Sequence, residues 1–335
     1  MTLRRHPNGP IITRRDLPPM PGLIQPSAVF NPGAIRVEGV PYLLLRVQSR
    51  GRRTFLVPAR GRTDRSFICA NVPTVLEGVD HLREPKAKRD LVVHHVYDPR
   101  LTVCDGRLLV VTAVDTDAGC RLVVWTAAGD PKAGFAGLDR LEPLAVTGTT
   151  DTRNGVLFPV QVGGRWLMLE RPNRPQGDGA PASGDEITLS SSADLRTWQA
   201  EGAVLGGRPR FWDELVGAGP PPLLTRDGWL LVYHGVATHF RSVNIYQAGA
   251  ALLDRDDPRR VLARTAENIL EPRALYELTG QVPNVVFPSG MTVDRLDDDG
   301  CAPPEARVWL YYGAADTAVC VATTTVATLL DACRA

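Results

Sequence analysis

Five times along this 335-residue chain, a turn residue is followed by four or five apolar residues that run into a small, aromatic or polar ending. The copies are residues 41–46, 106–112, 164–170, 228–234 and 307–313. A second strand-like run follows three of them, at residues 121–126, 186–190 and 249–254. Recurrence of one phrase at a similar spacing is the signature of a repeat architecture.

Buried β runs of this length, bounded by Gly, Pro and Asp, favour a four-stranded blade as the repeating unit. The sequence therefore predicts an all-β, five-bladed β-propeller with an axial active-site cavity. We expect a single catalytic domain over residues 1–335, with an N-terminal extension of about residues 1–22 packing on it. In a propeller the inner strands surround one axis, so residues far apart in sequence can share a site.

Composition excludes several partners. With a net charge of +1, the chain offers no electrostatic case for nucleic acid or an anionic membrane. The N-terminal residues 1–8 lack the apolar core of a secretory signal, and no run approaches the roughly 20 apolar residues of a membrane span. The six cysteines form no Cys-x-x-Cys pair, which argues against a zinc site and indicates buried thiols. We expect a cytoplasmic protein without a metal; a homo-oligomer stays open.

Two segments interrupt the rhythm of the strands. Residues 172–184 are too rich in Pro and Gly for a strand and predict a long loop inside the third blade. Residues 294–304 contain three consecutive aspartates but lack the ligand spacing of a calcium loop, so a solvated surface insertion is expected.

Charged residues stand in the breaks between strands. Asp98 precedes Pro99, which disfavours the α region and predicts an extended segment for the aspartate. Arg153 and Arg171 stand at the two ends of one predicted hairpin, so antiparallel strands would bring them side by side. Paired guanidinium groups suit a phosphate or carboxylate, because each donates two parallel hydrogen bonds. For Asp98, a turn with an Asp–Arg ion pair remains an alternative. For Arg153 and Arg171, surface arginines that donate to backbone carbonyls remain an alternative.

A glycine-rich segment precedes the fourth copy of the phrase. Gly217 and Gly219 permit a close approach of the backbone to a ligand, and three prolines stiffen the entry to the next strand. His234 at the end of that strand could donate to an anion, and a structural histidine is the alternative. Asp316 follows the last apolar strand.

Nine motifs in this order carry a resemblance that spans about residues 5 to 325. They are residues 30–34 (FNPGA), 97–100 (YDPR), 153–154 with 158–159, 171–172, 217–222 (GAGPPP), 233–235 (YHG), 249–254, 282–288 (VPNVVFP) and 312–316 (YGAAD). The series resembles glycoside hydrolase family 130, the inverting β-mannoside phosphorylases and their hydrolytic relatives. The family fold is a five-bladed propeller, in agreement with the repeat.

The resemblance implies phosphorolysis of a β-mannoside to α-mannose 1-phosphate, with inorganic phosphate as co-substrate and no cofactor. In the family the aspartate of the Asp-Pro-Arg motif is the general acid, which assigns that role to Asp98. The positions that hold phosphate in the family correspond to Arg153, Asn154, Arg171 and His234. The positions that bind the sugar beside the acid correspond to Asn31, Arg46, Tyr97 and Asp316.

One position departs from the family pattern. The phosphorylases carry a lysine two residues before the Gly-x-Gly segment, and that position is Leu215. The neighbouring Glu214 could serve as the base of an inverting β-mannosidase, which is the alternative activity. Retention of both arginines favours the phosphorylase, because the hydrolytic members tend to lose them. An inactive sugar-binding propeller, in which Leu215 marks an eroded site, is the third reading.

Overall fold

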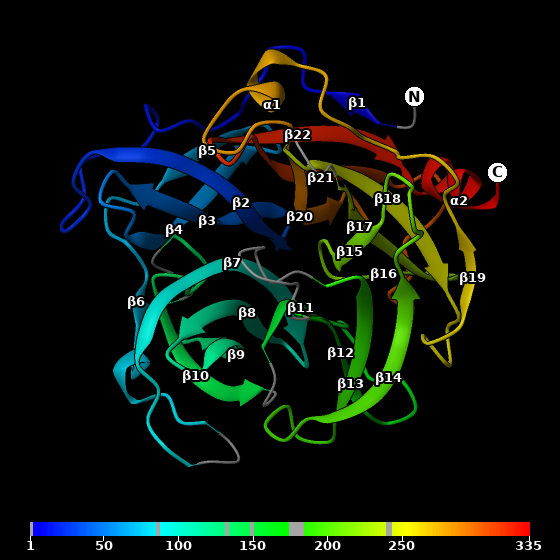
Figure 1. The fold of residues 1–335 in the computed structure, drawn as a ribbon, viewed down its shortest axis with the longest axis horizontal. Helices are drawn as coiled ribbons and strands as arrows, with labels where there is room; N and C mark the ends of the chain where they lie inside the picture. Colours follow the sequence, from blue (N-terminus) through cyan, green and yellow to red (C-terminus); the bar gives the residue numbers. More distant parts are fainter. Residues whose placement is uncertain (1–2, 85–87, 131–133, 148–150, 174–183, 239–242) are drawn as a thin grey trace.

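Five β-sheets surround a central axis in the computed structural model of this chain (Figure 1). The structure describes residues 3–84, 88–130, 134–147, 151–173, 184–238 and 243–335. Each sheet is one blade, and neighbouring blades follow one another along the chain. The expected all-β, five-bladed propeller is confirmed.

Strands are numbered along the chain. Blade 1 contains β2 (Pro26–Val37), β3 (Val40–Ser49), β4 (Thr54–Thr63) and β5 (Ser66–Cys69). Blade 2 contains the short β6 (Val75–Leu76), β7 (Val93–Cys104), β8 (Arg107–Thr116), β9 (Gly119–Ala127) and β10 (Arg140–Thr147), with a 3₁₀ turn at Val79–His81 between β6 and β7. Blade 3 contains β11 (Thr152–Leu157), β12 (Trp166–Pro172), β13 (Glu186–Ser192) and β14 (Gln199–Gly206).

Blade 4 contains β15 (Leu215–Ala218), β16 (Leu223–Thr225), β17 (Gly228–Ala237), β18 (Ile245–Leu253) and β19 (Val261–Arg264). Blade 5 contains β20 (Val286–Val293), β21 (Arg307–Ala314), β22 (Ala318–Thr325) and the N-terminal β1 (Arg4–Arg5). The helices in the described ranges are α1 (Leu275–Leu278) and α2 (Val326–Arg334), and α2 directly follows β22.

The repeated phrase has one structural meaning. Its five copies fall in β3, β8, β12, β17 and β21, which all pair directly with the strand nearest the axis in their blade. These strands are buried on both faces, which explains why they read as continuous apolar runs rather than as an alternation.

The two ends of the chain meet in blade 5. Strand β1 pairs with β22 through Arg4↔Thr323 and Arg5↔Ala322, so the N-terminus supplies the outer strand of the blade that the C-terminus completes. Arg5 also donates to the fully buried carboxylate of Glu277 over 2.8 Å. Hydrogen bonds between the ends thus close the ring.

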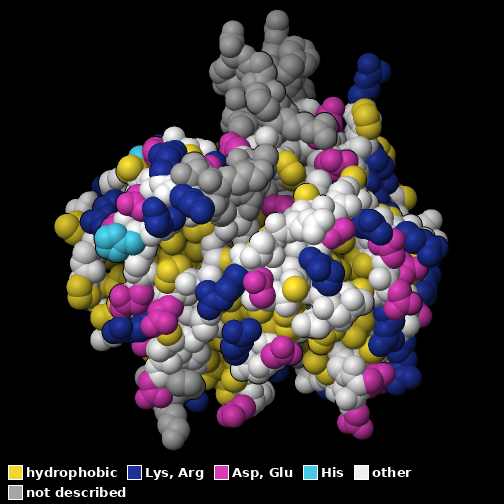
Figure 2. All heavy atoms as spheres, turned by 90° about the horizontal axis from the view of Figure 1, so that it is seen from below, with side chains coloured by type: hydrophobic (Ala, Val, Ile, Leu, Met, Phe, Trp, Pro, Cys, Tyr) yellow, Lys and Arg dark blue, Asp and Glu magenta, His cyan; other side chains and the backbone are white. Residues whose placement is uncertain are grey.

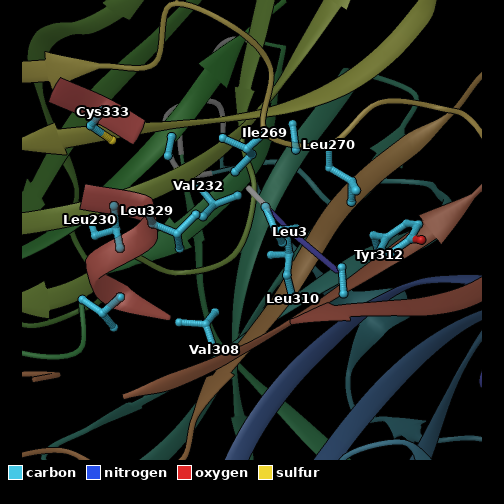
Figure 3. Close-up of a cluster of buried hydrophobic side chains, with 14 of the residues drawn as sticks. Leu3, Leu230, Val232, Ile269, Leu270, Val308, Leu310, Tyr312, Leu329 and Cys333 are labelled. Atoms are coloured by element: carbon cyan, nitrogen blue, oxygen red, sulfur yellow. The ribbon is translucent and has the colours of Figure 1, made fainter. Parts of the chain in front are cut away.

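Apolar side chains fill the spaces between neighbouring blades. One cluster joins blades 4 and 5 and includes Leu230, Val232, Leu310 and Tyr312, with Leu3 from the N-terminus and Leu329 from α2 packed on it (Figure 3). All six described thiols are free, and only Cys69 is not fully buried. The expectation of buried thiols is therefore confirmed.

Charges of both signs are interspersed over the face shown in Figure 2, in keeping with the net charge of +1. In the described ranges no helix is long and apolar enough to cross a membrane. Most of the loop expected at residues 172–184 lies outside the described residues. In the segment between β20 and β21, most of residues 294–300 is exposed, as expected for the surface insertion, but residues 301–303 are buried.

Candidate active site

The inner strands of blades 1, 2 and 3 carry the same irregularity. Directly after Phe30, Tyr97 or Arg153, each inner strand contains one residue more than the strand that pairs with it. Each inner strand therefore has a β-bulge at this point. The residue at the bulge is Asn31, Asp98 or Asn154, with φ of 44°, 52° and 55°. Asn and Asp tolerate this left-handed conformation better than other residues with a side chain.

Bulges next to an active site change the direction of a side chain. Here they place an amide or carboxylate from three blades at the axis of the propeller. The expectation of an extended backbone at Asp98 is therefore wrong in detail, because the residue lies within strand β7 but adopts a left-handed φ. Pro99 disfavours the right-handed α region for Asp98, and in the bulge Asp98 adopts the left-handed region instead.

Asp98 is held by groups from blade 1. Arg46 Nη1 donates to Asp98 Oδ1 over 2.8 Å, and Asn31 Nδ2 donates to the same oxygen over 3.0 Å. The guanidinium of Arg46 lies between the rings of Phe30 and Tyr97, at 4.6 Å from each centroid. These aromatic rings fix its plane, so the arginine has little freedom to leave the carboxylate.

Burial opposes ionisation of Asp98, whose side chain is 12% exposed, but the cations around it prevail. Arg46 and Arg100, with the hydrogen bond from Asn31, hold the pKa of this carboxyl below its usual range. Arg100 is buried beside it, and its Nε donates to Gly219 O over 2.6 Å, which ties blade 2 to blade 4 across the axis. Asp98 is thus an anion in the free protein.

Arg153 and Arg171 lie side by side, as the sequence predicts, because they are direct cross-strand partners in β11 and β12. Arg153 Nη2 lies 3.5 Å from Asp115 Oδ1. Arg171 is 7% exposed, and no carboxylate lies within 4 Å of it among the described residues. Burial, with a contribution from Arg153, lowers its pKa. The pair therefore carries an excess positive charge, which suits an anionic ligand.

His234 is fully buried inside β17, not at a strand end as the sequence suggested. It is the cross-strand partner of Gly217. A Cβ at Gly217 would come within 2.4 Å of His234 Cε1 and 2.9 Å of Asn154 Oδ1, so the glycine lets both side chains approach the backbone. Burial, then Arg171 and Arg100, hold the pKa of His234 well below its usual value. The ring is neutral.

Asp316 reaches the site from blade 5. It occupies a tight turn between β21 and β22, in which Ala315 and Asp316 both have positive φ. Burial and the charge of Asp98 raise its pKa to about 6, against the opposing effect of Arg46. The site therefore combines an ionised carboxylate and one that titrates near neutrality.

These side chains surround one axial cavity of about 400 Å³. Eight of the nine residues singled out from the sequence line it: Asn31, Arg46, Tyr97, Asp98, Arg153, Asn154, Arg171 and Asp316. His234 does not line the cavity; it lies behind Asn154 and packs on Phe287 at 4.7 Å between ring centroids.

Sequence reasoning missed other lining residues, including Asp115, Tyr246 and Phe287. Asp115 accepts a hydrogen bond from Tyr97 Oη over 2.8 Å in addition to its contact with Arg153. A signal for it exists. Ala113 is the cross-strand partner of Tyr97, just as Arg171 is the partner of Arg153. Because side chains alternate between the two faces of a strand, Asp115, two residues beyond Ala113, lies on the same face as Ala113.

Glu214 and Leu215 lie at the entry to β15. Glu214 accepts a hydrogen bond from Thr238 and is not part of the cavity wall. Leu215 pairs with Val236, so it lies on the same face of the sheet as Gly217 of β15 and His234 of β17. The side chain that replaces the expected lysine is 7% exposed and brings no charge to this face.

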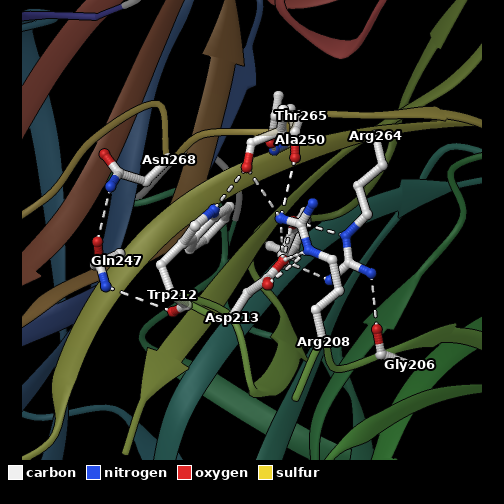
Figure 4. A network of polar contacts seen from close by, with 11 residues as sticks. Gly206, Arg208, Trp212, Asp213, Gln247, Ala250, Arg264, Thr265 and Asn268 are labelled. Atoms are coloured by element: carbon white, nitrogen blue, oxygen red, sulfur yellow. Dashed lines mark hydrogen bonds and ion pairs between the residues drawn. The ribbon is translucent and has the colours of Figure 1, made fainter. Parts of the chain in front are cut away.

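A buried polar network supports that segment (Figure 4). Asp213 is fully buried and accepts from Arg208 Nε over 2.8 Å, from Arg264 Nη2 over 2.6 Å and from Tyr233 Oη over 2.9 Å. Trp212 Nε1 donates to Ala266 O over 2.9 Å. Two guanidinium groups thus fix the turn that leads into β15, and the position of the glycine-rich backbone depends on it.

The axis of this five-bladed propeller thus carries a buried carboxylate and two adjacent arginines, of which Arg171 has no carboxylate within 4 Å among the described residues. The chain matches the family model of β-1,4-mannooligosaccharide phosphorylases over residues 2–335. It belongs to glycoside hydrolase family 130.

Characterised relatives are mannoside phosphorylases. The chain is 38% identical over 179 residues to a β-1,4-mannooligosaccharide phosphorylase of Ruminococcus albus, an alignment that covers 53% of this chain and 50% of the relative. It is 29% identical over 304 residues to a 1,2-β-oligomannan phosphorylase of a Thermoanaerobacter species, covering 88% and 89%. A β-1,2-mannobiose phosphorylase structure from Listeria innocua superposes with a TM-score of 0.78 at 24% identity, covering 100% and 99%. This last likeness concerns the fold.

Proposed function

We propose that this protein is an inverting glycoside phosphorylase that cleaves a β-mannoside with inorganic phosphate and releases α-mannose 1-phosphate. The observation that carries the proposal is the arginine pair of blade 3. Arg171 is buried beside Arg153 without a carboxylate of its own among the described residues. A buried cation without a counter-ion is costly unless a ligand supplies the charge. Phosphate does so, and a neutral water molecule does not.

The nucleophile then needs no general base. An inverting hydrolase uses a second carboxylate to deprotonate water. Phosphate is already an anion at neutral pH, so cations that hold it in place replace that base. Arg153 and Arg171 would each offer a fork of donors to the phosphate oxygens, with Asn154 beside them and His234 behind Asn154.

Asp98 is the proposed general acid, which delivers a proton to the departing glycosidic oxygen directly or through a sugar hydroxyl. In the free protein Arg46 and Arg100 hold it ionised. A phosphate dianion bound nearby adds negative charge, and a nearby like charge raises the pKa of a carboxyl. Protonation of Asp98 is therefore coupled to phosphate binding in this proposal. Asn31, Arg46, Tyr97 and Asp316 would bind the sugar beside the acid.

The hydrolase alternative rests on Leu215, which removes one cation from the anion site. Its candidate base, Glu214, is absent from the cavity wall and accepts a hydrogen bond from Thr238. The geometry therefore favours phosphorolysis over hydrolysis.

The test is to incubate the protein with β-1,2- and β-1,4-mannobiose across a phosphate titration, and to assay mannose 1-phosphate against free mannose. We expect mannose 1-phosphate only, at a rate that saturates with phosphate. Phosphate-independent release of mannose that disappears in Glu214→Gln would show a hydrolase. Binding of the disaccharides without turnover under either condition would show a sugar-binding propeller.

A further inference from the structure

A second hollow continues from the axial cavity past Arg46 and Asp316. It has a volume of about 470 Å³ and shares Gln48, Arg52 and Val282 with the cavity. The tip of the β3–β4 hairpin forms one wall, and the segment before blade 5 forms the other. We call this space the outer hollow, bounded by Gln48, Ser49, Arg50, Arg52, Gln281 and Val282.

The outer hollow has a positive wall. Arg50 and Arg52 are exposed at the hairpin tip, and neither lies within 4 Å of a carboxylate in the described part of the chain. Asp316 is the acidic residue in the described wall, and it already faces the charge of Arg46. Two guanidinium groups therefore remain available to a ligand.

Hydrogen bonds hold the two walls together. Ser27 Oγ donates to Gln48 O over 3.0 Å and accepts from Gln281 Nε2 over 3.1 Å. Arg50 N donates to Gln25 O over 3.0 Å, which anchors the hairpin tip to the start of blade 1. The backbone that presents the arginines is thus fixed before a ligand arrives, so little ordering of the chain opposes binding.

The position of the outer hollow relative to the reacting centre indicates which part of a substrate it meets. In a single displacement with inversion, the nucleophile and the leaving group lie on opposite faces of the anomeric carbon. The proposed anion site is in blade 3, and the outer hollow opens on the other side of Asp98 and Arg46, in blades 1 and 5. It therefore receives the leaving-group sugar.

We propose that the sugar released by this enzyme carries an anionic group, a carboxylate or a phosphate ester, which Arg50 and Arg52 bind. The inference rests on the proposed phosphorylase activity. A neutral sugar makes no use of either charge, whereas a carboxylate or phosphate matches the planar donor fork of each guanidinium.

The reverse reaction tests this assignment. Wild-type protein is given α-mannose 1-phosphate with glucose, mannose, glucuronate or glucose 6-phosphate, and released phosphate is measured. We expect the KM for one of the anionic acceptors to be about five- to tenfold below the KM for the neutral ones. This ratio lies between the affinity gain from a surface ion pair and the gain from a charge-assisted hydrogen bond. The carboxylate and phosphate arms distinguish the two sources of charge. Equal or better use of neutral acceptors overturns the proposal.

Variants of the hairpin locate the effect. Arg50→Gln and Arg52→Asn should each raise the KM for the anionic acceptor by a factor about five times larger than the factor for glucose. Asn suits position 52 because Arg52 has a φ of 61°. Arg53→Gln is the matched control, since Arg53 lies on the same tip over the ring of Phe55 and outside the outer hollow. An equal effect of all three changes contradicts the assignment.

Direct binding separates this inference from the proposed function. Calorimetry with methyl β-glucuronide, methyl β-glucoside and glucose 6-phosphate needs no turnover. The protein could bind an anionic sugar, more weakly in Arg52→Asn and in high salt, and yet turn over no acceptor. That result would refute the phosphorylase proposal and support the basic subsite. Turnover of neutral acceptors without binding of either anionic sugar would refute the basic subsite and support the phosphorylase proposal.

Discussion

Replacing Arg171 by methionine should change stability and activity in opposite directions. Arg171 is buried beside Arg153, and burial lowers its pKa, so its charged form is disfavoured in the folded state. The guanidinium is still charged at neutral pH, and the cost is therefore present throughout the physiological range. An apolar chain of similar length removes that cost. We expect the Tm of Arg171→Met without phosphate to rise by on the order of 2 °C.

Phosphate should reverse this order. A charge-assisted hydrogen bond is worth about 1.5–3 kcal/mol, and a guanidinium fork makes two of them to phosphate. At the lower figure the loss of both is about 3 kcal/mol, or roughly 100-fold in the apparent phosphate constant. Phosphate at 100 times its Kd stabilises a protein by about 2.7 kcal/mol, so wild type should gain Tm on addition of phosphate and the variant should not.

The assay is thermal unfolding with and without phosphate, together with initial rates of mannobiose cleavage across a phosphate titration. Arg165→Met is the matched control, because Arg165 directly precedes the same strand at its far end, where its Nε donates to Ser191 Oγ over 2.8 Å. The control should keep the wild-type phosphate response. A lower Tm for Arg171→Met without phosphate, combined with an unchanged phosphate constant, would refute the reasoning.

Three further substitutions test the remaining site. Asp98→Asn should lower turnover on an unactivated mannoside by about 10² to 10⁴ while circular dichroism stays native, and near-full activity would remove it as the acid. Leu215→Lys should lower the apparent phosphate constant about tenfold, measured by the same titration; no change would show that position 215 does not reach the anion. Asp316→Asn should stabilise the fold by on the order of 2 kcal/mol at pH 8 and by little at pH 4, followed by urea unfolding.

The sign of the last effect follows from the pKa. The carboxyl of Asp316 titrates at about 6 in the folded chain and at about 3.9 in an unfolded one. Between these values the folded state binds more protons, so the native protein loses stability as pH rises through 6. An amide does not ionise, and its advantage should appear over the same interval. A variant that is less stable at pH 8 would mean that Asp316 is stabilised as an anion.

The architecture of this protein can be predicted from its amino-acid sequence alone. A repeated apolar phrase marks one strand in each of five blades, because a strand buried on both faces must be apolar along its length. The pairing of Arg153 with Arg171 also followed from sequence, since antiparallel strands bring the two ends of a hairpin together. The motifs in fixed order, together with Arg46, identified eight of the residues that line the cavity.

The charge states of the site residues, in contrast, follow from the folded arrangement of the blades. The left-handed bulge that aims Asp98 at the axis depends on one extra residue relative to the neighbouring strand, and pairing register is not visible in the chain. The pKa of Asp98 depends on Arg46 from another blade, and that of His234 on complete burial. Both pKa shifts arise from long-range contacts and from desolvation, which depend on which residues are close in space. The repeat and the hairpin pairing depend only on spacing along the chain, so they are visible in the sequence.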